Sequence, residues 1–197
     1  SLEKPIIVTS VNFLSLIKEQ LEEINADALS IICEPQGKNT APAIITAAIS
    51  SLKNNPDQKL IVFPSDHIIS CDYDFEQIIQ QGLESCSELN LITFGITPDR
   101  PETDYGYLEV KKDIKEEILG LRVKTFTEKP DIEKAKAFLS NGNYFWNSGI
   151  FAFKTSSLIR EARLHCLETY KSCESSINSA AITENIIHLD PKNYSQC

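Results

Sequence analysis

The chain has 197 residues, of which 42% are hydrophobic and 24% are charged, an ordinary composition for a globular protein with a sizeable core. Its formal net charge of −9 argues against a non-specific surface for nucleic acid or anionic membrane, because the long-range field repels such polyanions. No apolar run approaches the roughly 18 residues that a membrane helix needs, and no basic-then-apolar leader opens the chain, so we expect a cytoplasmic protein.

The six cysteines form no C-x-x-C pair and have no histidine at the spacing of a zinc site. We therefore expect reduced thiols, several of them on apolar faces. A single nucleotide, held by local donors and a metal ion, remains compatible with the acidic charge.

Strand and helix patterns alternate over the first half of the chain. Short apolar runs rich in β-branched residues predict strands at 5–9, 28–33, 59–63 and 90–96. Amphipathic or small apolar patterns predict helices between them at 11–24, 43–52 and 74–86. This alternation predicts βαβ units with right-handed crossovers, and hence an α/β fold with a mainly parallel mixed sheet flanked by helices.

The pattern changes after Thr97. Proline-rich loop sequence leads into strands predicted at 108–110 and 121–126. Asp131 then caps a short predicted helix, and the aromatic segment 144–149 leads into a strand at 150–153. A helix follows from Thr155 or Ser156, and the remainder is weakly patterned, with a short helix predicted near Ile182 to Ile187.

The loop after the second predicted strand has the composition of a helix start. Thr40 supplies a hydroxyl that can cap free amides, and Pro42 stands where no amide donor is needed. Such helix starts attract anions. Gly37 allows close approach of the backbone, while Glu34 and Asn39 offer groups suited to a nucleobase edge. Local features alone favour a simple capped turn.

Asp66 directly follows an apolar strand. A hard cation at this strand end can bridge its carboxylate to phosphate oxygens, although a loop aspartate that caps the next element is the simpler interpretation. Because ligands bind beyond the carboxyl ends of parallel strands, we expect the loops at Glu34, Asp66 and Thr97 to converge on one crevice.

Further polar candidates lie in the second half. Glu128 can accept sugar hydroxyls and Lys129 can hold a phosphate, or the two form a solvated ion pair. Gly106, between two tyrosines, can bring backbone amides against a sugar, or it marks an ordinary bend. Asn147 follows Trp146, and an amide beside an aromatic ring is common in carbohydrate pockets; the alternative is a buried tryptophan beside a turn.

These candidates belong to five motifs that stand in order along the chain: Glu34-Pro-Gln-Gly-Lys-Asn-Thr-Ala-Pro-Ala43, Pro64-Ser-Asp-His67, Gly95-Ile-Thr-Pro98 with Pro101-Glu-Thr-Asp-Tyr-Gly-Tyr107, Phe126-Thr-Glu-Lys-Pro130 and Trp146-Asn-Ser-Gly-Ile-Phe151. In this order they resemble the motifs of the mannose-1-phosphate guanylyltransferases, the GDP-mannose pyrophosphorylases. That family includes the guanylyltransferase half of enzymes that also carry phosphomannose isomerase activity. The match runs from about Pro5 to Phe153.

The resemblance implies a Rossmann-like nucleotidyltransferase fold of the nucleotide-diphospho-sugar transferase type. It also implies transfer of GMP from GTP to mannose 1-phosphate, which releases pyrophosphate and makes GDP-mannose as a precursor of polysaccharides. The implied cofactor is Mg²⁺, and the sugar phosphate attacks the α-phosphorus in line without a covalent enzyme intermediate. Catalysis of this kind is mainly positioning and charge neutralisation.

The matched positions imply a role for each candidate. The residues that border guanine and ribose are Glu34, Gly37, Asn39 and Thr40. Glu34 is also a suitable acceptor for the N1 and N2 donors of guanine. Asp66 is implied as the catalytic, metal-binding carboxylate. The residues that hold the sugar phosphate are Gly106, Glu128 and Asn147 at the mannose and Lys129 at its phosphate.

The chain also departs from the family pattern. Asp104 stands where the family usually has glycine, which adds a charge beside the proposed sugar site. The family's Gly-rich triphosphate loop would precede Ser1, and a second metal-binding aspartate would follow Cys197. We therefore expect 1–197 to be a partial nucleotidyltransferase domain, inactive or nearly so alone, with nucleotide-side βα units at 4–100, a sugar-side segment at 101–170 and a weakly ordered tail at 171–197. Loss of the central first strand predicts self-association into a homo-oligomer.

Other functions remain open on sequence grounds. The chain can be a noncatalytic, sugar-nucleotide-binding or regulatory subunit, or a nucleotidyltransferase for another hexose 1-phosphate. A glycosyltransferase that uses a sugar nucleotide is less well supported. It would need an Asp-x-Asp metal pair directly after an apolar strand, whereas Asp72-Tyr73-Asp74 lies past the strand, where a helix begins.

Overall fold

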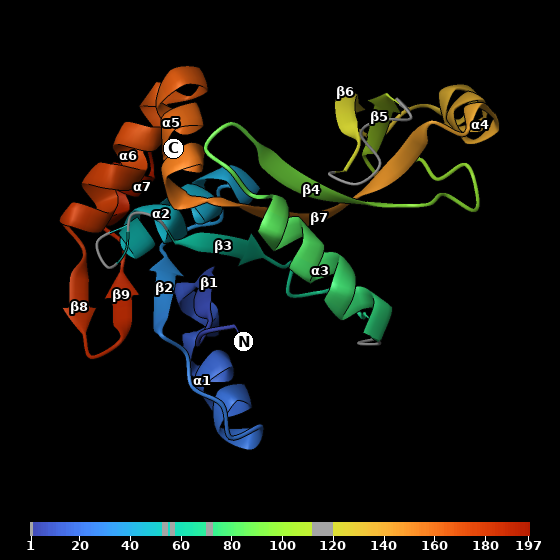
Figure 1. Cartoon of the computed structure of the whole chain (residues 1–197). Helices are drawn as coiled ribbons and strands as arrows, with labels where there is room; N and C mark the ends of the chain where they lie inside the picture. Colours follow the sequence, from blue (N-terminus) through green and yellow to red (C-terminus); the bar gives the residue numbers. More distant parts are fainter. Residues whose placement is uncertain (1, 53–54, 56–57, 70–72, 112–119) are drawn as a thin grey trace. The chain divides into compact units, whose positions relative to one another are not determined.

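The computed structural model describes residues 2–52, 55, 58–69, 73–111 and 120–197 (Figure 1). The chain divides into two compact units. Unit 1 comprises Ser1–Gln58 and Thr155–Cys197, and unit 2 comprises Lys59–Lys154. These units do not coincide with the parts 4–100 and 101–170, whose division by function stays a prediction.

Unit 1 contains a four-stranded sheet in the order β1-β2-β9-β8 (Figure 1). Strands β1 (Ile6–Ser10), β2 (Ser30–Glu34) and β9 (Ile186–His188) run parallel, and β8 (Ala181–Thr183) is antiparallel to β9. Its described helices are η1 (Val11–Phe13), α1 (Leu14–Glu23), α2 (Thr40–Leu52), α5 (Thr155–His165), α6 (Leu167–Asn178) and α7 (Pro191–Tyr194). The apolar face of α1 packs on the sheet residues because its leucines and isoleucines recur at helical spacing.

Unit 2 is organised around one long strand. Strand β7 (Tyr144–Lys154) pairs antiparallel with β3 (Lys59–Val62), β4 (Leu91–Ile96) and β5 (Tyr107–Lys111), and β5 pairs antiparallel with β6 (Arg122–Thr127). Helix α3 (Tyr73–Ser85) contacts β3 and β7, and α4 (Ile132–Asn141) contacts β7. Tyr107, Ala135 and Trp146 form a buried cluster between the sheet and α4.

Helix α4 begins and ends as its sequence predicts. The Asp131 side chain accepts a hydrogen bond from the Lys134 amide at the start. Gly142 closes the helix in the left-handed region, with φ of 74°.

The predicted α/β class is confirmed, and parallel strands occur in the sheet of unit 1. The described strand pairs of unit 2 are antiparallel. Strands β3 and β4 remain parallel to each other, as the βαβ pattern predicts, but β7 lies between them. Strand β7 starts at Tyr144 rather than at Ile150, because its aromatic residues continue the pleated pairing with β5.

The prediction for the last part of the chain is wrong. The segment 171–197 contains most of α6, the β8–β9 hairpin and α7 rather than a weakly ordered tail. Ile182 and Ile187 pair across the two strands of the hairpin instead of sharing a short helix. Strand β9 is ordered by parallel pairing with β2. The paired residues are about 155 positions apart in the chain, so no local sequence pattern predicts this contact.

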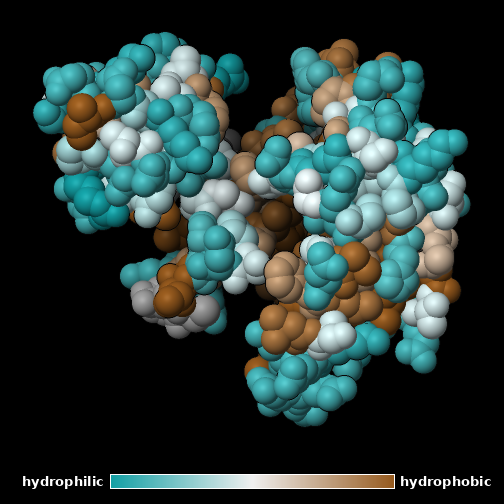
Figure 2. All heavy atoms as spheres, turned by 180° about the vertical axis from the view of Figure 1, so that it is seen from behind, coloured by the Kyte–Doolittle hydropathy of each residue, from teal (hydrophilic) through white to brown (hydrophobic). Residues whose placement is uncertain are grey.

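Surface features of the described residues complete the fold. Figure 2 shows where hydrophobic residues reach the surface of each unit. None of the described helices is both long and apolar enough to cross a bilayer. Five cysteines are described, and all five are free thiols, as expected; Cys71 and Asp72 lie outside the described residues.

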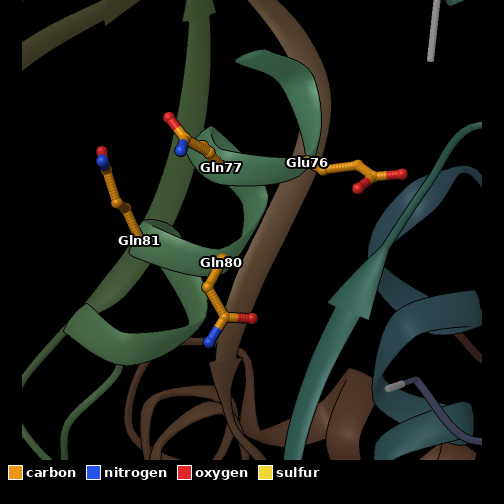
Figure 3. A pocket seen from close by; sticks show the side chains of 4 residues that line it. All are labelled: Glu76, Gln77, Gln80 and Gln81. Carbon is orange, nitrogen blue, oxygen red and sulfur yellow. The ribbon is translucent and has the colours of Figure 1, made fainter. Parts of the chain in front are cut away.

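An open hollow along α3 is lined by Glu76, Gln77, Gln80 and Gln81. Figure 3 shows that Gln77 and Gln81 point to one side of the helix and Glu76 to the other. The lining contains none of the predicted site residues.

Candidate functional site

The predicted sugar-side residues of unit 2 lie together. The backbone amide of Asn147 donates to the carbonyl oxygen of Gly106 over 2.8 Å. This bond continues the pairing of β5 with β7, in which Tyr107 stands opposite Trp146. Strand register therefore places the loop that carries Gly106 directly beside Asn147.

Gly106 is required by its neighbours. A Cβ atom at this position would lie 2.7 Å from Cε2 of Phe126 and 2.9 Å from Oε2 of Glu128. Its backbone does not adopt the left-handed region, so the reason for glycine is close approach rather than an unusual turn. The Glu128 carboxylate thus lies against the bare backbone of Gly106.

Lys129 completes this group, which we call the sugar-side group: Gly106, Glu128, Lys129 and Asn147. The Lys129 ammonium lies 3.9 Å from Oε1 of Glu128, and both side chains are about three-fifths exposed, at 61% and 59%. An ion pair of this kind contributes little to stability. Lys129 also has φ of 43°, a left-handed conformation that is uncommon for a residue other than glycine and often marks functional sites.

Thr93 is a neighbour that the sequence did not reveal. Its hydroxyl donates to Oδ1 of Asn147 over 3.1 Å, from the adjacent strand β4. This bond uses the amide oxygen of Asn147 and leaves its NH₂ group as a donor. Nothing in the local pattern distinguishes Thr93 from an ordinary strand threonine, because the contact depends on the register of β4 against β7.

The ring of Trp146 does not line the same space as Asn147. It is only 6% exposed and belongs to the core of unit 2, because neighbouring residues of a strand point to opposite faces. The Arg100 guanidinium lies 5.1 Å from the centre of this ring, and Tyr105 meets it edge-on at 5.3 Å. The buried-tryptophan interpretation is therefore the correct one.

The loop that precedes β5 is held by Glu102. The backbone amides of Asp104 and Thr103 donate to its carboxylate and hold its pKa below the usual range, with a further contribution from Arg100. The backbone carbonyl oxygen of Glu102 accepts a hydrogen bond from the hydroxyl group of Tyr107. Asp104, which departs from the family pattern, therefore contributes its amide to the fold of this loop.

Asp66 stands after β3 in unit 2 with its side chain 86% exposed, and Nε2 of the His67 ring lies 3.9 Å from Oδ1 of Asp66. The described residues include no group of three or more acidic, cysteine or histidine side chains that could hold a metal ion alone. One exposed carboxylate nevertheless fits Mg²⁺, which commonly binds one or two carboxylates and takes its other ligands from phosphates and water. The metal role of Asp66 stays a prediction.

The predicted nucleotide-side residues lie in unit 1, between β2 and α2. Glu34 is the last residue of β2 and Thr40 the first of α2. Asn39 adopts the left-handed region, with φ of 65°. A Cβ atom at Gly37 would meet no described atom within 4 Å, so the chain itself does not require glycine there. The convergence of this loop with those at Asp66 and Thr97, which belong to unit 2, stays a prediction.

The loop is bound to the end of the chain in a way that the sequence did not indicate. The Tyr194 hydroxyl donates to Oε1 of Glu34. The Lys38 ammonium donates to the carbonyl oxygens of Ser195, at 2.8 Å, and Cys197, at 3.3 Å. The side chains of Glu34 and Lys38, which stand on the two sides of Gly37 in the sequence, therefore both bind the segment 194–197.

Residues 1–190 match the family model described as Nucleotidyl transferase, and the chain belongs to that family. Its curated relatives include the mannose-1-phosphate guanylyltransferase RfbM of Salmonella typhimurium, 37% identical over 202 residues, which cover 100% of this chain and 41% of that protein. The alginate biosynthesis protein AlgA of Pseudomonas aeruginosa is 31% identical over 196 residues, again 100% of this chain and 41% of the relative. The chain thus spans about two fifths of the length of these relatives.

Two solved structures resemble the fold closely. A structure described as mannose-6-phosphate isomerase from Helicobacter pylori is 30% identical, with a TM-score of 0.85 over 98% of this chain and 74% of that chain. Another, described as mannose-1-phosphate geranyltransferase from Thermus thermophilus, is 26% identical, with a TM-score of 0.78 over 96% of this chain and 51% of that chain.

Proposed function

We propose that the protein transfers GMP from GTP to mannose 1-phosphate and so makes GDP-mannose and pyrophosphate. The observation that carries the proposal is the sugar-side group, in which a carboxylate, an ammonium, an amide and a bare glycine backbone lie together in unit 2. Membership of the nucleotidyl transferase family supports the class of reaction. The names of the curated relatives support a guanylyl group as the group transferred and mannose 1-phosphate as its acceptor.

The sugar-side group suits a phosphorylated hexose. The Glu128 carboxylate accepts hydrogen bonds from sugar hydroxyls, and the NH₂ group of Asn147 donates one, since Thr93 already uses its amide oxygen. The Lys129 ammonium attracts the phosphate. With the sugar held in this way, an oxygen of the sugar phosphate attacks the α-phosphorus of GTP. The bond between the α-phosphorus and the oxygen that bridges it to the β-phosphate breaks, and pyrophosphate leaves with that oxygen.

On the nucleotide side, the proposal assigns base recognition to the Glu34 carboxylate and backbone contacts to Gly37 and Asn39. Because no Cβ occupies the space at Gly37, the backbone there is open to a ligand. Asp66 would hold Mg²⁺, which supplies positive charge to the phosphates when it is bound. The protein contributes mainly position and charge, as is usual when phosphoryl groups move.

The test combines binding with turnover. Calorimetry should show binding of mannose 1-phosphate to residues 1–197. A coupled assay with GTP and Mg²⁺ should show release of pyrophosphate by a protein of the full length of the relatives, because residues 1–197 are expected to be inactive or nearly so alone. The variant Asn147→Ala should weaken binding of mannose 1-phosphate by about tenfold or more, because it removes a hydrogen bond to a charged or polar group of the ligand. Thr93→Val should weaken it by about threefold to fivefold, since the amide remains but is no longer oriented.

The matched control is Asn12→Ala, which changes an asparagine of η1 in unit 1 and should leave binding unchanged. Equal effects of Asn147→Ala and Asn12→Ala would contradict the proposed sugar site. Tighter binding of another hexose 1-phosphate would favour the corresponding nucleotidyltransferase. Binding of GDP-mannose without any turnover in the protein of full length would favour the regulatory subunit.

A further inference from the structure

The C-terminal segment of the chain is fixed against the strand that carries Glu34. The amide of Leu189 donates to the carbonyl oxygen of Cys33 over 3.1 Å, one residue before Glu34. Asp190 then caps α7 through the amide of Asn193, and Ser176 of α6 donates to the Asp190 carbonyl over 3.0 Å. Strand β2 and helix α6 therefore both anchor the segment before it reaches Tyr194.

Tyr194 is fully buried, with 0% of its surface exposed. Burial raises the pKa of its phenol, and the neighbouring Glu34 carboxylate raises it further, so the phenol stays protonated and donates a hydrogen bond to Glu34. A carboxylate has about four lone-pair positions. The bond to Oε1 therefore orients the Glu34 side chain and still leaves acceptor positions for a ligand.

A second tyrosine of unit 1 shows that this contact is not a general feature of its packing. Tyr170 is also buried, at 5% exposed, and its hydroxyl group also donates a hydrogen bond to a glutamate, Glu174. That pair lies within α6 and does not involve the loop that follows β2. Tyr194 is thus joined to a predicted nucleotide-binding residue, and Tyr170 is joined to its own helix.

We propose that Tyr194 is a positioning residue for base selectivity: its hydroxyl holds the Glu34 carboxylate in the orientation that accepts the N1 and N2 protons of guanine. The inference rests on the proposed function, because it assumes that the loop after β2 binds a guanine nucleotide. Lys38 supports the same arrangement, since its ammonium ties the loop to the carbonyl groups that follow Tyr194.

The test compares GTP with inosine triphosphate, which lacks the N2 amino group, by calorimetry. The wild-type protein should bind GTP about tenfold or more tightly, as one hydrogen bond to a charged group predicts. Tyr194→Phe should reduce this ratio to about threefold or less, because the unrestrained carboxylate no longer meets both donors. The matched control Tyr170→Phe removes the hydroxyl group of the second buried tyrosine of unit 1 and should keep the wild-type ratio.

Several results would overturn the inference. The first is a ratio of the affinities for GTP and inosine triphosphate that is unchanged in Tyr194→Phe. The second is an equal loss of affinity for both nucleotides in this variant, which would show that Tyr194 has a merely structural role. If Tyr194→Phe does not fold, Glu34→Gln keeps the tyrosine and should also reduce the ratio; a ratio unchanged in that variant would exclude base reading by Glu34. A wild-type protein that binds neither nucleotide would overturn the proposed function as well, whereas a preference for GTP that survives Tyr194→Phe overturns this inference alone.

Discussion

The two groups of candidate residues are held in place by different kinds of contact. In unit 2, the sugar-side group is set by backbone pairing of β5 with β7 and by the missing Cβ of Gly106. In unit 1, the loop after β2 is held by side chains that reach the C-terminal segment. The sugar side therefore depends on strand register, whereas the nucleotide side depends on individual side-chain contacts with a distant part of the sequence.

The two units also differ in the pKa shifts of their ionisable groups. In unit 1, burial raises the pKa of the thiols of Cys33, Cys173 and Cys197 and of the phenols of Tyr170 and Tyr194. In unit 2, hydrogen bonds lower the pKa of Glu102, Glu109 and Asp131, chiefly from the Asp104 amide, the Lys124 ammonium and the Lys134 amide respectively. Unit 2 also contains Cys86, whose pKa burial raises, and unit 1 contains Asp27, whose pKa is lowered by its hydrogen bond with Lys4, so the units differ in the balance of these groups. Unit 1 should therefore be the more sensitive of the two to alkaline pH, and unit 2 the more sensitive to acid.

The largest effect should follow from Gly106→Ala. The added Cβ displaces the Glu128 carboxylate and the Phe126 ring, so the hydrogen bonds between the carboxylate and the sugar hydroxyls are lost; a hydrogen bond to a charged group contributes about 1.5 to 3 kcal/mol. Mannose 1-phosphate should therefore bind about 10-fold to 100-fold more weakly. The melting temperature should change by less than about 4 °C, because the displaced atoms are the ends of adaptable side chains.

The control for this change is Gly37→Ala on the nucleotide side. Its Cβ would meet nothing within 4 Å, and Gly37 belongs to the other unit. The affinity for mannose 1-phosphate should then change by about twofold or less. Wild-type affinity in Gly106→Ala would show that Glu128 does not contact the sugar.

Alkaline pH should destabilise unit 1 before unit 2. Burial raises the pKa of Cys173 from 9.0 to about 12, and the Tyr194 pKa is raised in the same direction. Folding thus favours the protonated forms. Their stabilisation is complete below the unfolded pKa values of about 8.5 to 10 and is lost as the pH rises above them, by about 1 to 2 kcal/mol.

The measurement can separate the units because the chain has one tryptophan, Trp146, which lies in unit 2. Between pH 8 and pH 11, the far-ultraviolet circular dichroism of the whole chain should decrease before the emission maximum of Trp146 shifts. Cys173→Ala should move the first transition to higher pH. A single transition seen by both probes would contradict the difference between the units.

Acid should act more on unit 2 than on unit 1. The pKa values of Glu102, Glu109 and Asp131 are lowered in unit 2, against that of Asp27 in unit 1, and the stabilisation by these carboxylates, present above about pH 4 to 5, is lost as the pH falls.

The smallest effect should come from Lys38→Met. The variant removes the hydrogen bonds from the ammonium to the Ser195 and Cys197 carbonyl groups, which should lower the free energy of unfolding by about 1 kcal/mol. Amide hydrogen exchange at 194–197 should become faster. Lys4→Met, which breaks an ion pair with side chains 61% and 75% exposed, is the control and should cost about 0.5 kcal/mol or less. Equal exchange rates in both variants would show that Lys38 does not hold the segment.

Much of the fold could be predicted because its determinants are local. The alternation of β-branched runs and amphipathic patterns located β1 to β4 and the first three helices to within a few residues, and Asp131 and Gly142 marked both ends of α4. The full length of β7 and the pairing of β9 with β2 could not be predicted in the same way. Both depend on a partner strand that is distant in the sequence, and strand propensity depends on that partner.

The candidate site shows the same division. The order of motifs was enough to select Gly106, Glu128, Lys129 and Asn147, and the structure brings these four together. It was not enough to find Thr93 or Tyr194, or to show that the Trp146 ring faces the core.

The sequence by itself therefore determined the class of fold, the family and the polar residues of the candidate site. The periodicity of apolar residues predicts the class of fold, and the order of the motifs indicates the family and these residues. Only the tertiary structure decided which groups orient those residues. The Thr93 hydroxyl reaches Asn147 through strand register, and the Tyr194 hydroxyl reaches Glu34 across about 160 residues of chain. A hydrogen bond depends on distance and direction in space, and neither can be read from spacing along the sequence.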